Sequence, residues 1–159
     1  MTSSNSAVRR LTELGINYEL LEHDAVFTMD DVSRMLDIPI NNQVKTLVLG
    51  YQIAGKDELV LCGISASGQL DMRKVSQILG VSRSKLQLLN AERIESALGV
   101  PRGAIGLAHS NGHHSPLLSE KLLESDFLYF GAGSNTLTLK VATKDCVDLL
   151  PLICADIEK

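Results

Sequence analysis

The sequence predicts a mixed α/β fold of the α+β kind, in which helices cover one mixed sheet or a partly closed barrel. Segments with helical periodicity alternate with segments of strand periodicity along the whole chain, and capping residues and glycines mark most helix ends. The chain has 159 residues, 45% of them hydrophobic, which is enough to bury a core. We therefore expect a single domain over residues 1–159.

The helices are predicted from apolar residues at helical spacing. Their expected inward faces are, in chain order, Val8, Leu11 and Leu14; Val32, Met35 and Leu36; Met72, Val75, Ile78 and Leu79; Ile94, Ala97 and Leu98; and Val147 and Leu150. A further short helix is expected from Ser119. The expected N-caps are Thr28, Asp71, Asn90 and Thr143, and glycines 15, 80 and 99 are expected to end helices.

Strands are predicted where apolar residues alternate or run together. Their expected ranges are 18–22, 44–49, 59–64, 127–130 and 137–142, with a turn at 54–57 between the second and the third. The segment 101–116 is rich in glycine, serine and histidine, and we expect strand and loop there.

The composition of the chain limits the classes of function that the protein can have. The net charge of −4 excludes a general nucleic-acid binder, so any RNA contact is expected over a small area, such as a single-stranded end, and no DNA partner is expected. The odd count of three cysteines favours a reducing compartment. We expect neither a signal peptide nor a membrane-spanning helix, and so a soluble cytoplasmic protein.

The histidines near position 110 raise the question of a metal site. His109 and His113 are four residues apart, as in helical zinc ligands, and His114 follows. The intervening Gly112 and the following Pro116 argue against a helix, and no carboxylate or cysteine is near. We expect a solvated loop and no metal. The sequence also lacks a serine-nucleophile motif, a P-loop and a dinucleotide fingerprint, so no cofactor is expected.

Lys45 and two glycine-rich turns are the other candidates for chemistry. On a strand, Lys45 shares a face with Leu47 and Leu49, and it either extends from the strand end to solvent or lines a pocket. The turns Gly103–Gly106 and Gly131–Gly133 either leave backbone N–H groups to a ligand or are tight strand connections. Spacing alone leaves both alternatives open in each case.

Five segments in the same order resemble the YbaK/EbsC family, free-standing relatives of the editing domain in bacterial prolyl-tRNA synthetases. They are Leu21-Glu22-His23-Asp24 with Val26-Phe27-Thr28; Val44-Lys45-Thr46-Leu47; Gly68-Gln69-Leu70-Asp71-Met72-Arg73-Lys74-Val75; Gly103 to Gly112; and Gly131-Ala132-Gly133. The resemblance covers nearly the whole chain.

The resemblance implies an aminoacyl-tRNA deacylase that edits mischarged tRNA in trans. It also implies that the substrate is a tRNA(Pro) charged with a small amino acid and that prolyl-tRNA synthetase is a partner. Lys45 is the implied functional lysine, holding the terminal phosphate or polar groups of the substrate. The implied substrate-binding residues are His23, Phe27, Thr46, Gly103, Ala104, Ile105, Gly106, His109, Gly131, Ala132, Gly133 and Thr138. A synthetase pocket cannot strongly reject an amino acid that differs by one methylene, because that methylene contributes only about 1–3 kcal/mol of binding free energy. Hydrolysis of the wrong aminoacyl ester corrects the resulting errors.

The sequence departs from the family pattern at three places. Ser110 stands where a proline is common, Thr138 where an aspartate is common, and Ala132 within a turn that often has two glycines. These departures leave open a catalytically silent module that binds a tRNA end or a synthetase. A third alternative is a binder of amino acids or nucleotides.

Overall fold

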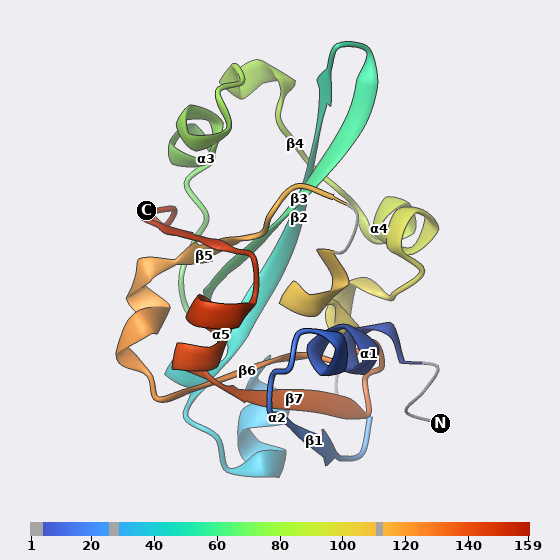
Figure 1. Cartoon of the computed structure of the whole chain (residues 1–159), viewed down its shortest axis with the longest axis vertical. Coiled ribbons are helices and arrows are strands. Elements are labelled where there is room, and N and C mark those ends of the chain that lie inside the picture. Colours follow the sequence, from blue (N-terminus) through green and yellow to red (C-terminus); the bar gives the residue numbers. More distant parts are fainter. Residues whose placement is uncertain (1–4, 26–28, 111–112) are drawn as a thin grey trace.

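The strands in the described part of the protein form two sheets. The computed structural model describes residues 5–25, 29–110 and 113–159. A three-stranded sheet has the order β1-β7-β6, and a five-stranded sheet has the order β4-β2-β3-β5-β8 (Figure 1). The α/β class is confirmed, with the strands divided between two sheets instead of lying in one.

The described part of the chain contains eight strands and five α-helices. The strands are β1 (Glu19–Glu22), β2 (Val44–Ile53), β3 (Lys56–Ser65), β4 (Gln87–Leu88), β5 (Leu117–Ser119), β6 (Phe127–Gly131), β7 (Leu137–Ala142) and β8 (Ile153–Ala155). The α-helices are α1 (Ser6–Glu13), α2 (Met29–Leu36), α3 (Met72–Leu79), α4 (Ala91–Leu98) and α5 (Thr143–Leu149).

The two sheets differ in the relative direction of their neighbouring strands. The smaller sheet is antiparallel throughout. In the larger sheet β4, β2 and β3 are antiparallel, whereas β3, β5 and β8 are parallel. A single bridge between Gln43 and Tyr129 connects the start of β2 to β6. The two sheets are therefore joined at the end of β2 where Lys45 lies.

The hairpin of β2 and β3 is longer than the sequence predicted. Its turn consists of Ala54 and Gly55, with φ angles of 53° and 79°. Positive φ at both central residues is the type I′ geometry, whose twist matches that of the flanking strands. The hairpin consequently runs to Ile53 and Lys56, and its tip extends beyond the helices around it (Figure 1).

Most predicted helix ends are confirmed. The side chains of Asp71 and Asn90 accept N–H hydrogen bonds at the starts of α3 and α4, and Gly80 and Gly99 end these helices in the left-handed conformation. The sequence analysis missed Asn5, which caps α1 in the same way.

Several other predictions for the helices are wrong. The Thr143 side chain makes no capping bond, because the cap position of α5 is Ala142. Met35, Ile78, Ala97 and Val147 were expected to face inward and are exposed. These helices have only seven or eight residues and bury a narrow stripe, so a residue at the border of the apolar pattern stays in solvent. Thr28 lies outside the described residues.

The segment before β5 forms short 3₁₀ turns instead of a strand. Turns at Arg102–Ala104 and Leu107–Ser110 place Leu107 and Ala108 in the core beneath α1. A third 3₁₀ turn, Glu120–Glu124, replaces the predicted short helix and is capped by Ser119 as expected. None of the helices in the described part of the chain has the length and apolar character needed to cross a bilayer.

The core helix α4 provides a stability test. Ile94 is 2% exposed and Ile78 is 38% exposed. We expect Ile94→Ala to lower the free energy of unfolding by about 2–5 kcal/mol, because it leaves a cavity. The matched change Ile78→Ala should cost much less. Urea denaturation measures both, and equal losses would contradict this placement of the two residues.

Candidate functional site

The two glycine turns predicted as candidates lie against each other. A Cβ on Gly106 would overlap the carbonyl oxygen of Gly131, and a Cβ on Gly131 would overlap the carbonyl oxygens of Ala104 and Ile105. The N–H of Gly133 also donates to the carbonyl of Ala104, with 2.9 Å between N and O. Only glycine permits this approach of two backbones. Gly106 and Gly131 thus serve the contact between the turns.

This contact forms one side of a narrow cleft where the two sheets meet. The cleft has a volume of about 40 Å³. The residues that line it come from both sheets and from the turn at Gly103, and they include Gln43, Val44, Gly103, Ile105, Gly131 and Thr138. The structure therefore brings together four of the residues that the resemblance implied. Gln43, buried beside them, was not predicted, since a glutamine before a strand carries no distinctive pattern.

Thr138 and His23 form a hydrogen-bonded pair at this cleft. Thr138 lies on β7 and is 6% exposed. His23 follows β1, the strand beside β7, and its Nε2 is 2.9 Å from Thr138 Oγ1. Its Nδ1 is 2.8 Å from the carbonyl oxygen of Asp24. Two residues that are 115 positions apart in sequence are thus directly connected.

His109 is buried, and the expectation of a solvated loop is wrong for it. Its Nδ1 accepts a hydrogen bond from the N–H of Gly106, with 2.9 Å between the nitrogens. Burial lowers the pKa of His109, although the backbone contact with Gly106 opposes this effect. The ring therefore closes the 3₁₀ turn that follows Gly106. His113 and His114 do not share a metal site with it, and no group of three metal-binding side chains occurs in the described ranges.

Lys45 lies on the face of β2 that carries Leu47 and Leu49, as predicted. Strand alternation puts it opposite Val44, which lines the cleft. Its Nζ donates to the carbonyl oxygen of Gly68, with 2.9 Å between N and O. The structure therefore holds the ammonium next to the cleft's strand instead of inside the cleft.

The remaining predicted residues are less directly connected to the cleft. Thr46 is 7% exposed, and its hydroxyl has no hydrogen-bond partner within the described ranges. Ala132 is buried, and its carbonyl accepts from the Asn5 side chain at 2.8 Å. Phe27 lies outside the described residues.

Contacts from the C-terminal segment hold the loop at Gly68 in place. The sequence did not predict these contacts. Glu158 is 2% exposed, and one of its carboxylate oxygens accepts from the N–H and the hydroxyl of Ser65, at 3.1 and 2.9 Å. Any Cβ on Gly68 would overlap this carboxylate. Burial raises the pKa of Glu158, but hydrogen bonds from Ser119 and Ser65 and the charge of Lys121 together hold that pKa below its usual value. A glutamate next to the last residue of a chain gives no signal in sequence.

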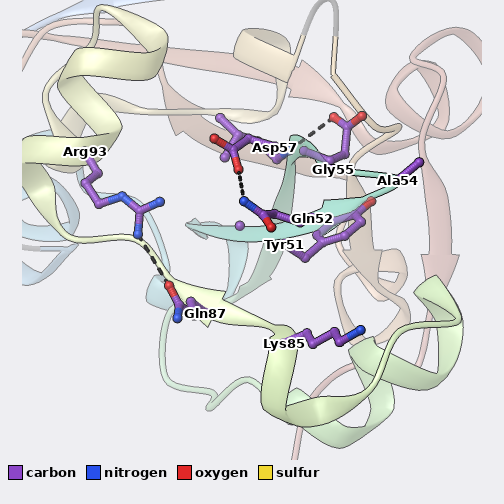
Figure 2. Close-up of a pocket in the computed structure, with 11 residues that line it drawn as sticks. Tyr51, Gln52, Ala54, Gly55, Asp57, Lys85, Gln87 and Arg93 are labelled. Carbon is purple, nitrogen blue, oxygen red and sulfur yellow. Dashed lines mark hydrogen bonds between the residues drawn. The ribbon is translucent and has the colours of Figure 1, made fainter.

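A larger hollow of about 550 Å³ lies at the other end of the β2–β3 hairpin. Figure 2 shows Lys85 and Arg93 on one side of it and Asp57 on the other, with Tyr51 and Gln52 between them. Asp57 is bonded to Gln52, and Arg93 to Gln87. The hollow contains none of the residues implied by the resemblance, and its charges are mixed.

The cysteines are not nucleophiles at this site. Burial raises the pKa of Cys62 to about 12, and burial together with Asp145 and Cys154 raises that of Cys146 to about 12. A thiol with such a pKa is not ionised at neutral pH. The groups at the cleft that could take part in chemistry are instead a hydroxyl, an imidazole and backbone groups, with a lysine nearby.

The sequence of the chain matches a known protein family. Residues 23–149 match the model of the aminoacyl-tRNA editing domain. This match covers most of the chain, and the protein belongs to that family.

Two curated relatives are similar over part of their length. The prolyl-tRNA editing protein ProX of Acetoanaerobium sticklandii is 26% identical over 105 residues, which are 66% of this chain and 62% of that protein. A proline–tRNA ligase of Thermosipho africanus is 33% identical over 81 residues, which are 51% of this chain and 13% of the ligase. The chain thus matches less than two thirds of either relative.

Solved structures share the fold. The crystal structure of the hypothetical protein APE2540 superposes with a TM-score of 0.84 and 17% identity, covering 95% of this chain and 97% of the other. A candidate trans-editing enzyme for prolyl tRNA synthetase superposes with a TM-score of 0.80 and 21% identity, covering 98% of each chain. At these identities the comparison establishes the architecture.

The contact between the glycine turns predicts unequal effects of two alanine substitutions. Gly131→Ala should destabilise the protein by about 1–3 kcal/mol, because the methyl group overlaps backbone atoms that cannot rotate away. Gly103→Ala should cost little, since nothing lies within 4 Å of its Cβ position. Thermal unfolding compares the two variants. A Gly131→Ala protein as stable as Gly103→Ala would refute the close contact.

The Glu158 network predicts an acid-dependent contribution to stability. The pKa of Glu158 is lowered on folding, so its contribution is present above the usual value of 4.5 and is lost as pH falls through the lower, folded value. Wild type should therefore be more stable than Glu158→Gln at pH 7, and the difference should shrink below pH 4.5. Denaturation at several pH values measures it, and a difference that grows in acid would contradict the network.

Proposed function

We propose that this protein is a trans-editing deacylase that hydrolyses the ester between the 3′ end of a mischarged tRNA and its amino acid. The observation that carries the proposal is the family match over residues 23–149, together with a cleft lined by family-motif residues from both sheets. The names of the relatives support tRNA(Pro) as the tRNA and prolyl-tRNA synthetase as a partner. The family resemblance implies that the wrong amino acid is small.

The size of the cleft supports a small acyl group. The cleft is narrow, with a volume of about 40 Å³, so we expect an amino acid with a small side chain to enter it more easily than one with a large side chain. The walls at Gly103 and Gly131 are backbone, and Ile105 adds an apolar side chain. Backbone groups of this kind can orient a carbonyl without contributing charge. Discrimination between amino acids would then depend on the size of the side chain, as in the second site of a double-sieve editing mechanism.

The position of Lys45 supports contact with the RNA instead of the acyl group. The ammonium is held by the Gly68 carbonyl on the side of β2 away from Val44. There it is suited to a phosphate of the single-stranded 3′ end, with which it would make a charge-assisted hydrogen bond. A small, local contact of this kind agrees with a chain of net charge −4.

Lys45 provides the test. We expect Lys45→Ala to lower kcat/KM for alanyl-tRNA(Pro) by about 10- to 100-fold, because a hydrogen bond to a charged group contributes about 1.5–3 kcal/mol. Arg93→Ala, which removes a cation from the hollow in Figure 2, should leave the rate unchanged.

Release of labelled alanine, followed over time, measures both variants. Equal rates for wild type and a folded Lys45→Ala protein would refute the role of Lys45. Binding of charged tRNA by wild type without any release of alanine would favour a catalytically silent module, the alternative that Thr138 and Ser110 leave open.

A further inference from the structure

The ammonium group of Lys45 is oriented by a hydrogen bond to a loop. Its Nζ donates to the carbonyl oxygen of Gly68, with 2.9 Å between N and O. An ammonium group carries three N–H donors and no acceptor, so this bond uses one donor and leaves two for a ligand. The direction of those two donors depends on where the Gly68 carbonyl lies. Whatever holds this carbonyl therefore also determines where Lys45 can bind a phosphate.

The Gly68 carbonyl belongs to a turn that begins on the strand beside Lys45. Lys45 on β2 pairs with Ile64 on β3, and Ser65 is the last residue of β3. The N–H of Gly68 donates to the carbonyl oxygen of Ser65 at 2.9 Å, which closes a turn over residues 65–68. Ser67, in the middle of this turn, is exposed, so packing against the core restrains the turn little. The turn therefore needs support from another part of the chain to hold the carbonyl in one direction.

Glu158 supplies this support from the C-terminal segment. One of its carboxylate oxygens accepts hydrogen bonds from the N–H and the hydroxyl of Ser65, at 3.1 and 2.9 Å. The other carboxylate oxygen lies against Gly68, because a Cβ on that glycine would overlap it. The carboxylate thus contacts both ends of the turn, at the residue that starts it and at the residue whose carbonyl binds Lys45.

Backbone hydrogen bonds fix the segment that carries Glu158. The N–H of Asp71 donates to the carbonyl of Ile157 at 2.8 Å, and the N–H of Lys159 donates to the carbonyl of Gln69 at 2.9 Å. The main chain on both sides of Glu158 is thus bonded to the segment that follows the turn. Glu158 is also 2% exposed, and a buried carboxylate is stable only where hydrogen bonds compensate its lost hydration. The carboxylate therefore has few alternative positions and holds the turn in place.

Glu158 acts on Lys45 through the turn and not by direct attraction. No ion pair joins these two residues within the described ranges. The cation whose charge helps to lower the pKa of Glu158 is Lys121, which lies in the 3₁₀ turn after β5. Removal of the carboxylate should therefore change the orientation of the Lys45 ammonium while leaving its charge in place.

We propose that Glu158 is a positioning residue, which holds the Gly68 carbonyl so that Lys45 presents its two remaining N–H donors to the RNA. This inference rests on the proposed deacylase function, in which Lys45 contacts a phosphate of the tRNA 3′ end. Glu158 itself does not touch the substrate. The C-terminal segment thereby determines how strongly β2 binds the RNA, although it is far from Lys45 in sequence.

A double-mutant cycle of Glu158→Gln and Lys45→Ala, measured by steady-state deacylation of alanyl-tRNA(Pro), tests this role. Glu158→Gln should lower kcat/KM by about 3- to 30-fold, the scale of coupling between members of one hydrogen-bond network. The loss should appear as a higher KM, because the phosphate contact is made before and during the reaction alike. In the Lys45→Ala protein, Glu158→Gln should cause no further loss, since the group that it positions is absent.

Two further variants separate positioning from general destabilisation. Asp156→Asn removes a neighbouring carboxylate of the same segment, which is exposed and pairs with Lys74 at 2.9 Å, and it should behave as wild type. Ser65→Ala removes one of the two donors to Glu158 and keeps the carboxylate. It should raise KM less than Glu158→Gln does, and only when Lys45 is present. Circular dichroism and a thermal melt confirm that each variant is folded.

The outcomes separate the positioning role from the deacylase function. An active wild type whose kcat/KM survives in Glu158→Gln overturns the positioning role and leaves the deacylase function standing. An equal loss with and without Lys45 also overturns it, because Glu158 would then act independently of the lysine. A loss confined to kcat overturns it as well, since a smaller amount of active protein lowers kcat and leaves KM unchanged. Wild type that hydrolyses none of the charged tRNAs overturns both proposals.

Discussion

The contact between the backbones at Gly106 and Gly131 is the constraint on which the rest of the site depends. It fixes the segment after α4 against the end of β6 in the small sheet. Side chains at either glycine would force the segments apart. Because the cleft lies between these same elements, its width is set by this contact. His109 reinforces the contact by closing the turn with its Nδ1.

A second set of interactions holds the opposite face of β2. The C-terminal segment pairs with the loop at Gly68 through a bridge between Leu70 and Glu158, and the Glu158 carboxylate binds Ser65 at the end of β3. The same loop supplies the carbonyl that holds Lys45. Lys45 and the cleft thus lie on the two sides of one strand, each fixed by a separate network. This arrangement allows separate contacts for the RNA and for the acyl group.

Local patterns predicted most of the fold, and long-range contacts account for what they did not predict. The strands at 137–142 and 127–130 and the caps Asp71 and Asn90 follow from local sequence. The division into two sheets depends on pairings between distant strands, which periodicity does not specify. For the site, the motifs included four of the residues that line the cleft, but they did not predict that Gly106 and Gly131 contact each other. The pairing of His23 with Thr138 across 115 positions and the burial of Glu158 depend on tertiary structure alone.

The central claim is that the cleft selects and hydrolyses a wrong aminoacyl ester. The most direct test is the ratio of deacylation rates for alanyl-tRNA(Pro) and prolyl-tRNA(Pro), measured with wild-type protein under single-turnover conditions. The account predicts rapid release of alanine and a proline ester that persists as long as it does without protein. Equal rates for the two esters, or no release of either amino acid, would contradict it.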